Sequence, residues 1–286
     1  MGFEISLLFA FGAMVCWGFG DFFIQRCTRK IGDIESLAYI GIIGSIILVP
    51  FILKDVQLIF SVSNMILLLV LGILTFIVAL FDFEALKKGK LSIIDVIIEL
   101  ELPVTIILGF IFFKESLSIA QFSIVSLIFI SVIMMATKSL GSWKVKLERG
   151  VLIALIAAVG MGVVNFLTAI SSKSISPLMA VWIPWLIFSV LCFIFIVKQE
   201  GLSKFIKNGI RFKWIVLFMG VFDTLAWIFY AFAVSKNEIA ITTAITESYP
   251  AIALFLGVWL NKERIHGYQY LGAVLAIVAS FILAIL

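Results

Sequence analysis

The stretch NMILLLVLGILTFIVALFDFEAL, residues 64–86, decides the fold class of this chain. It runs from Met65 to Phe81 without a charged residue. An α-helix rises about 1.5 Å per residue, so about 20 mostly apolar residues cross the roughly 30 Å hydrocarbon core of a bilayer. The stretch is therefore predicted to be a transmembrane helix.

The rest of the chain has the same character. Of its 286 residues, 63% are hydrophobic and 13% are charged, whereas a soluble domain is about half apolar and about a quarter charged. The mean hydropathy is +1.24. We predict an all-α integral membrane protein with ten transmembrane helices. The predicted helices span residues 4–25, 35–53, 64–86, 91–113, 118–137, 150–170, 177–198, 212–234, 239–260 and 267–286.

The basic residues are distributed unevenly between the connections. Those after the first, third, fifth, seventh and ninth predicted helices carry 17 of the 21 Lys and Arg residues. Because cytoplasmic connections are enriched in Lys and Arg, both termini are predicted to lie outside the cytoplasm of a multi-pass cell-membrane protein. The first apolar segment has neither a basic start nor a small-residue cleavage site, so it is predicted to be a retained helix. The remaining basic residues are Lys54, Lys114, Lys173 and Lys236.

The two halves of the chain resemble each other. Five helices per half is an odd number, so the second half must enter the membrane inverted relative to the first, with a central cavity between the repeats. The expected units are a first repeat at 1–137, a connecting loop at 138–148 and a second repeat at 149–286. The matching stretches are Trp17–Phe22 with Met161–Phe166, Glu101–Pro103 with Ser248–Pro250, and Lys114-Glu115 with Lys262-Glu263.

This arrangement resembles the EamA-type transporters of the drug/metabolite transporter superfamily. The shared features are the two five-helix halves, the Trp17-Gly18 pair, and a proline in the fourth helix of each half with a glutamate 12 or 13 residues later. The second half departs from the pattern, because Met161 stands where the first half has Trp17. The resemblance implies a ten-helix basket with a central cavity. It also implies transport of small organic metabolites, amino acids or drugs, often as export.

Ionisable side chains in the middle of the predicted helices are few and of one sign. An ionised group at the bilayer centre costs several kcal/mol, so each needs a partner or a water-lined cavity. No Lys or Arg lies comparably deep. Asp82 and Glu84 are set apart, because Lys87 and Lys88 follow closely and predict pairing at the interface. Some acids could instead be protonated and hydrogen-bonded between helices. The deep acids are Asp21, Asp95, Glu99, Glu101, Asp223 and Glu247.

Two helices combine these acids with a proline. Asp95 and Glu99 share a helical face, while Glu101 lies about 200° round the helix from Glu99. Pro103 and Pro250 each remove a backbone hydrogen bond and predict a bend near the membrane centre. Polar patches just before the two bends are therefore expected to face each other.

Aromatic residues lie close to the acids. Trp17 is four residues before Asp21, and Trp227 is four residues after Asp223, so each pair shares a face. Such pairs suit a cationic amine through cation–π and ionic contacts, although core packing would also explain the aromatics. The candidate substrate-binding residues are Trp17, Asp21, Glu99, Glu101, Asp223, Trp227, Tyr230, Glu247 and Tyr249, with Pro103 and Pro250 as helix bends.

The sequence predicts a secondary active transporter for a small organic metabolite or drug, an amine or another cationic or zwitterionic compound. Protons are expected to couple the flux through Asp21, Glu99, Asp223 or Glu247. The alternatives are export of an amino acid or neutral metabolite, an ion channel and a membrane enzyme. The sequence has no nucleophile-and-base set, metal cluster or phosphate-binding loop, which predicts no catalytic residue, metal or cofactor. The expected partners are the substrate, protons and the lipid bilayer, without nucleic acid.

Overall fold

The computed structural model describes residues 2–89, 91–98, 100–136, 150–260, 262 and 264–286. Within these ranges every regular element is helical, which confirms the all-α class. Eight helical segments of the described chain are long and apolar enough to cross a membrane, with Ile239–Leu260 counted as one segment. Two shorter apolar segments lie where the fourth and fifth spans were expected: Glu101–Phe113, and Ile119–Ser131 of a helix that continues to Ala136. Ten spans of full length are thus not found in the described part of the chain.

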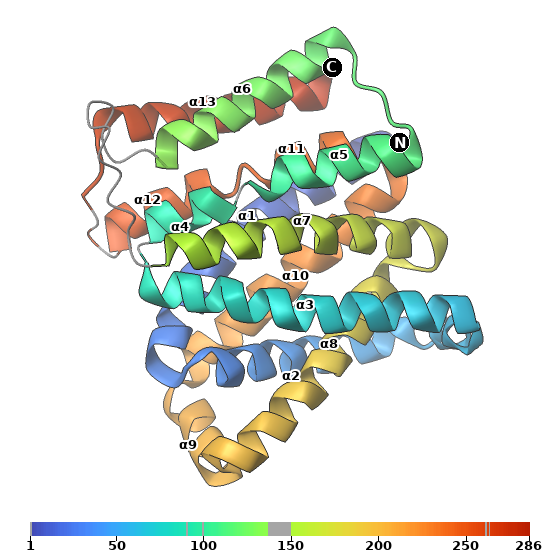
Figure 1. The fold of residues 1–286 in the computed structure, drawn as a ribbon, viewed down its shortest axis with the longest axis vertical. Coiled ribbons are helices and arrows are strands. Elements are labelled where there is room, and N and C mark those ends of the chain that lie inside the picture. Colours follow the sequence, from blue (N-terminus) through green and yellow to red (C-terminus); the bar gives the residue numbers. More distant parts are fainter. Residues whose placement is uncertain (1, 90, 99, 137–149, 261, 263) are drawn as a thin grey trace.

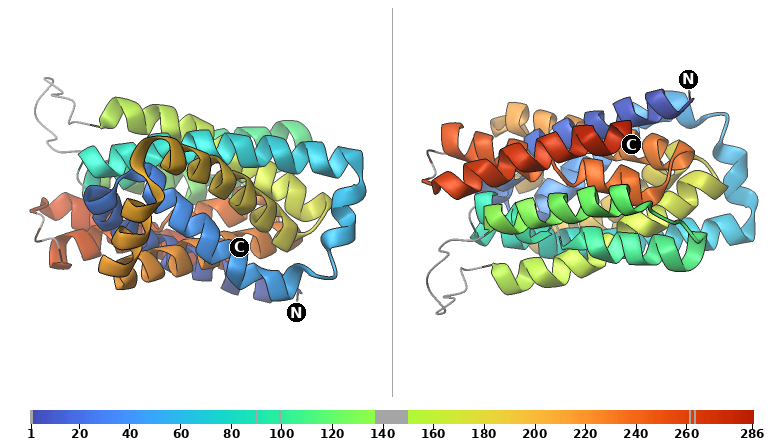
Figure 2. Two further views of the ribbon diagram at one scale, coloured as in Figure 1. Left: turned by 90° about the horizontal axis from the view of Figure 1, so that it is seen from below. Right: turned by 90° about the horizontal axis from the view of Figure 1, so that it is seen from above.

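The first half contains α1 (Gly2–Ile31), α2 (Asp33–Ile52), η1 (Val56–Phe60), α3 (Val62–Lys88), α4 (Leu91–Ile98), α5 (Glu101–Phe113) and α6 (Ile119–Ala136). The second half contains α7 (Val151–Ser174), α8 (Pro177–Phe195), η2 (Ile196–Glu200), α9 (Leu202–Arg211), α10 (Lys213–Lys236), α11 (Ile239–Thr246), α12 (Pro250–Leu260) and α13 (Gly267–Ile285). Helices α2, α3 and α7 run in nearly the same direction, α8 and α10 cross them diagonally, and both termini lie toward the same end of the bundle (Figure 1). Figure 2 shows the same bundle from two further sides.

The contacts between the two halves are reciprocal. Helix α1 packs on α10 and α12 of the second half, and its counterpart α7 packs on α3 and α5 of the first. Helices α2 and α8, which correspond to each other, pack together, as do α6 and α13. Such reciprocity is what a two-fold relation between two similar units requires. It agrees with the inverted repeats expected from the sequence.

The two spans that contain Pro103 and Pro250 are interrupted rather than bent. In the first half α4 ends at Ile98 and α5 begins at Glu101, so Pro103 occupies the first turn of α5. In the second half α11 ends at Thr246 and α12 begins with Pro250 itself. The N–H groups of a first helical turn have no acceptor within the helix, so proline is tolerated there. The chain therefore stops one helix and starts another beside the predicted acids.

Two glycines allow the first helix of each half to cross the interrupted span of the other half. A Cβ atom added to Gly18 of α1 would lie 2.6 Å from Cβ of Ile252 in α12. A Cβ atom added to Gly162 of α7 would lie 2.6 Å from Cβ of Val104 in α5. Both distances are too short for a side chain, so the backbones approach closely only because these residues are glycine.

The lysines that follow the two interrupted spans share a backbone conformation. Lys114 and Lys262 both have left-handed backbones, with φ of 54° and 56°. After this turn, the Glu115 carboxylate accepts hydrogen bonds from the N–H groups of Ile239, at 2.8 Å, and Ala240, at 3.1 Å. A carboxylate at a helix N-terminus is stabilised by the unpaired N–H groups and the helix dipole. Glu115 thus holds the start of α11 in the opposite half, whereas Glu263 lies outside the described residues.

Candidate functional site

A buried cavity lies between the two halves. Its volume is about 50 Å³, which is room for roughly three to five water molecules. The two interrupted spans contribute Ile98 and Glu101 from one half and Tyr249 from the other. The complete lining is Trp17, Asp21, Ile24, Leu37, Ile40, Thr75, Ala79, Asp82, Phe83, Ile98, Glu101, Met161, Asn165, Trp185, Phe188, Asp223, Trp227 and Tyr249.

Four carboxyl groups line this cavity, and no Lys or Arg is among the lining residues. They come from four helices and are all buried: Asp21 in α1, Asp82 in α3, Glu101 in α5 and Asp223 in α10. Burying an ionised carboxylate without a partner costs several kcal/mol. A proton or a bound cation inside the cavity would offset this cost.

The position of Asp82 differs from the prediction. Asp82 was expected to pair with Lys87 and Lys88 at the interface, but it lies on the cavity wall. Glu84 behaves as expected, because its carboxylate forms ion pairs with both lysines. Two residues that are two positions apart point about 200° away from each other around a helix axis, so Asp82 and Glu84 must face different ways. The spacing of Thr75, Ala79 and Asp82 on one helical face is the signal that could have identified Asp82.

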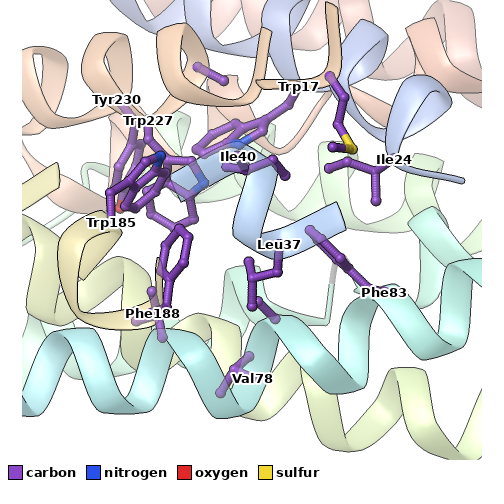
Figure 3. Close-up of a cluster of buried hydrophobic side chains, with 14 of the residues drawn as sticks. Trp17, Ile24, Leu37, Ile40, Val78, Phe83, Trp185, Phe188, Trp227 and Tyr230 are labelled. Atoms are coloured by element: carbon purple, nitrogen blue, oxygen red, sulfur yellow. The ribbon is translucent and has the colours of Figure 1, made fainter. Parts of the chain in front are cut away.

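Tryptophan and tyrosine rings gather beside this cavity, and Figure 3 shows Trp17, Trp185, Trp227 and Tyr230 among the buried side chains. The rings of Trp17 and Trp227 meet edge to face, with centroids 5.3 Å apart. Trp185 of α8, which the sequence did not single out as a site residue, lies 5.8 Å from Trp227. Tyr249 lies 6.0 Å from Trp17. One aromatic cluster in the cavity wall thus contains Trp17, Trp185, Trp227 and Tyr249.

Tyr249 also connects the aromatic rings to the acids. Its hydroxyl group is hydrogen-bonded to the Asp21 carboxyl group. Because Tyr249 lies between α11 and α12, this bond joins the first helix of one half to the interrupted span of the other. Movement of that span therefore changes the surroundings of Asp21.

Two predicted site residues, Tyr230 and Glu247, are fully buried just behind the lining. Tyr230 packs against Trp17, with ring centroids 5.5 Å apart, and its hydroxyl donates to the Asn165 carbonyl oxygen at 3.3 Å. Glu247 accepts a hydrogen bond from Thr246 Oγ1 at 3.3 Å. Both residues therefore act on the cavity through the side chains in front of them.

Glu247 and Glu101 form a carboxyl pair that joins the two halves. The two carboxyl groups interact across the boundary between the halves. An ionised carboxylate has no hydrogen to donate, so a hydrogen bond between two carboxyl groups requires a proton on one of them. The pair can therefore hold one proton beside the cavity, as carboxyl pairs do in other proteins.

Two predicted acids are not placed. Glu99 lies outside the described residues, as does the side chain of Asp95. Conversely, the sequence analysis did not select Asn165, although its amide lines the cavity and lies 3.4 Å from Glu247 Oε1. Asn165 is the counterpart of Asp21 in the alignment of the two halves, and that correspondence was the available signal.

Comparisons with known proteins agree with this architecture. A solved structure titled "Crystal structure of protein" superposes with a TM-score of 0.74 over 96% of this chain and 94% of that chain. Its sequence identity is 15%, so the likeness establishes the fold alone. Curated proteins gave no match to the chain. The EamA-like transporter family matches residues 4–137 and 148–285, which together cover both halves. The chain belongs to the EamA-like transporter family.

Proposed function

We propose that this transporter is a secondary carrier for small organic compounds that bear a positively charged nitrogen. The observation that supports this substrate class is the cavity lining, in which four carboxyl groups face aromatic rings without a basic residue. A cationic nitrogen gains ionic contacts with carboxylates and cation–π contacts with tryptophan faces. Both are stronger in a site without bulk water.

Two helices present an acid and a tryptophan together. Asp21 lies four residues after Trp17 on α1, and Asp223 lies four residues before Trp227 on α10. The two helices pack along each other, so both pairs reach one cavity. A nitrogen bound in the cavity would face carboxyl groups from both helices.

The lining favours a cation over an amino acid. A zwitterionic amino acid brings a carboxylate as well as an ammonium group, and the carboxylate needs a donor of its own. The lining supplies neutral donors, such as the Asn165 amide and the Tyr249 hydroxyl, but no Lys or Arg. Export of an amino acid or a neutral metabolite is therefore the second candidate, with Asn165 as the group that would receive the uncharged or anionic end.

Carrier transport requires the two halves to move. A cavity of about 50 Å³ is too small for an organic amine, so entry requires the cavity to widen. Inverted-repeat transporters open to one side at a time by rocking of the repeats. The interruptions after Ile98 and Thr246 break helical hydrogen bonding beside the cavity, which suits them to this movement.

Trp227→Leu tests the substrate class. The change keeps apolar bulk but removes the indole face, which contributes a desolvated cation–π contact of about 2 kcal/mol. The affinity for a cationic ligand should therefore fall about thirtyfold. The affinity for an uncharged ligand of the same shape should fall far less. Binding of both ligands to purified protein, measured by calorimetry, gives the comparison.

Trp214→Leu on the same helix is the control, because Trp214 is 62% exposed and is not a lining residue. Equal losses for both ligands would favour the neutral-metabolite candidate.

We also propose that both termini lie outside the cytoplasm, on the basis of the uneven distribution of basic residues. A cysteine introduced near Lys144 should be protected from an impermeant thiol reagent in intact cells, and one added after Leu286 should be labelled. Cys16, Cys27 and Cys192 are buried, so background labelling should be low. The opposite labelling pattern would reverse the orientation.

A further inference from the structure

Helix α9 has an apolar stripe that the protein leaves uncovered. Leu202, Ile206 and Ile210 recur every four residues and so share one side of the helix. Their side chains are 43%, 52% and 70% exposed. The helix connects α8 to α10, at the lower left of Figure 1, where two apolar helices end. At this position an uncovered apolar stripe meets the surface layer of the bilayer.

Basic side chains border the stripe on the same helix. Lys207 and Arg211 follow Ile206 and Ile210 directly, and with Ser203 these residues line an open groove along α9. A short helix with an apolar side and a Lys- and Arg-rich side is typical of helices that lie in the headgroup region of membranes. The groove therefore combines an apolar floor with positive charge.

The opposite side of α9 is held firmly against α2. Phe205 stacks on Tyr39 with ring centroids 4.2 Å apart. Asn208 Nδ2 donates to Glu35 Oε2 at 2.8 Å, and Lys204 Nζ lies 3.6 Å from Glu35 Oε1. These contacts fix the rotation of α9 about its axis, so the stripe and the groove must face outward. Lys204 is paired with Glu35, so the basic side chains that line the groove are those of Lys207 and Arg211.

We propose that α9 binds anionic phospholipids, with Ile206 and Ile210 at the acyl boundary and Lys207 and Arg211 on the phosphate groups. The apolar floor favours a lipid over a free phosphate, because a free phosphate gains nothing from it. Two neighbouring features extend the same surface. Trp214 is exposed one turn further on, as expected of an interfacial anchor, and Lys213 lies over its ring.

The test is local lipid selectivity. The full-length protein carrying Ser203→Cys is labelled with bimane, since Ser203 borders the groove and the three native cysteines are buried. Quenching by brominated phosphatidylglycerol and by brominated phosphatidylcholine is compared in proteoliposomes. One basic side chain at an anionic surface contributes about fivefold, so two should give about a 25-fold preference for phosphatidylglycerol.

Lys207→Gln with Arg211→Gln should reduce this preference to about 1. Lys54→Gln with Lys114→Gln removes the same charge from two exposed lysines away from α9 and should leave it unchanged. Raising the salt concentration to about 1 M should weaken the preference of the parent protein, because charges are then screened beyond about 3 Å. Equal quenching by the two lipids, a preference that survives the double substitution, or a preference abolished by soluble glycerol phosphate would each overturn the proposal.

Discussion

Glu247→Gln is expected to abolish uptake driven by an imposed pH gradient in proteoliposomes, while substrate exchange without a gradient continues. The glutamine amide keeps the shape of the side chain and can still hydrogen-bond to Glu101, but it cannot release a proton. A proton-coupled cycle needs a group that loses its proton when the substrate binds. Glu247 is the best placed of the described acids predicted for this role, because it is fully buried and interacts with a second carboxyl group, that of Glu101.

The remaining acids separate coupling from substrate binding. Glu101→Gln should behave like Glu247→Gln, because the two carboxyl groups interact. Asp21→Asn and Asp223→Asn should mainly weaken the binding of the cationic substrate, since both carboxyl groups line the cavity. Glu84→Gln is the control, because Glu84 is paired with lysines at the helix end. If all four cavity variants retained the wild-type pH dependence, proton coupling through these residues would be wrong.

Gly18→Ala should destabilise the protein by about 3 kcal/mol. Overfilling a packed site costs roughly 1–3 kcal/mol, and the added Cβ would lie 2.6 Å from Cβ of Ile252, a branched carbon with little freedom to move. Thermal unfolding in detergent can be followed with a thiol-reactive dye, since the buried cysteines become accessible only on unfolding. Gly162→Ala should have a similar effect, because its Cβ would meet Val104 in the reciprocal contact.

Gly20→Ala on the same helix is the matched control. There the nearest atom to the added Cβ is the Asp223 nitrogen at 3.7 Å, which is an ordinary contact. Alanine is favoured over glycine within a helix by up to about 1 kcal/mol, so Gly20→Ala should be neutral or stabilising. Equal unfolding temperatures for Gly18→Ala and Gly20→Ala would show that the crossing of α1 and α12 tolerates a side chain.

The fold class and the repeat relation could be predicted from the sequence because both depend on long, regular patterns. The length of an apolar run identifies a transmembrane span, and an odd number of spans in each half means that the second half is inverted in the membrane. The division of the fourth and ninth spans was harder to predict. Pro103 and Pro250 marked the places, but a proline within an apolar run is compatible with a bend or with a new helix start.

The site was predictable only in part, because the direction of a side chain depends on which neighbour its helix meets. Asp21, Glu101 and Asp223 were selected for their depth in apolar segments, and depth alone does not bring them to one cavity. Asp82 was assigned to the interface because its sequence neighbours are lysines. The packing of α3 against α7 and α8 turns it inward instead. Likewise, nothing local in the sequence joins Glu115 to the start of α11.

The two halves share reciprocal helix contacts but not the side chains that they give to the cavity. Asp21 and Trp17 in the first half correspond to Asn165 and Met161 in the second, and all four line the cavity. If the halves exchange conformations when access switches sides, identical halves would offer the same site to both compartments. Because the two halves differ in their side chains, they offer different sites to the two compartments. The substrate concentration that half-saturates transport should therefore differ between the two faces of the membrane. The maximal rates must differ in the same proportion, because binding differences alter the populations of states but not the equilibrium distribution of solute.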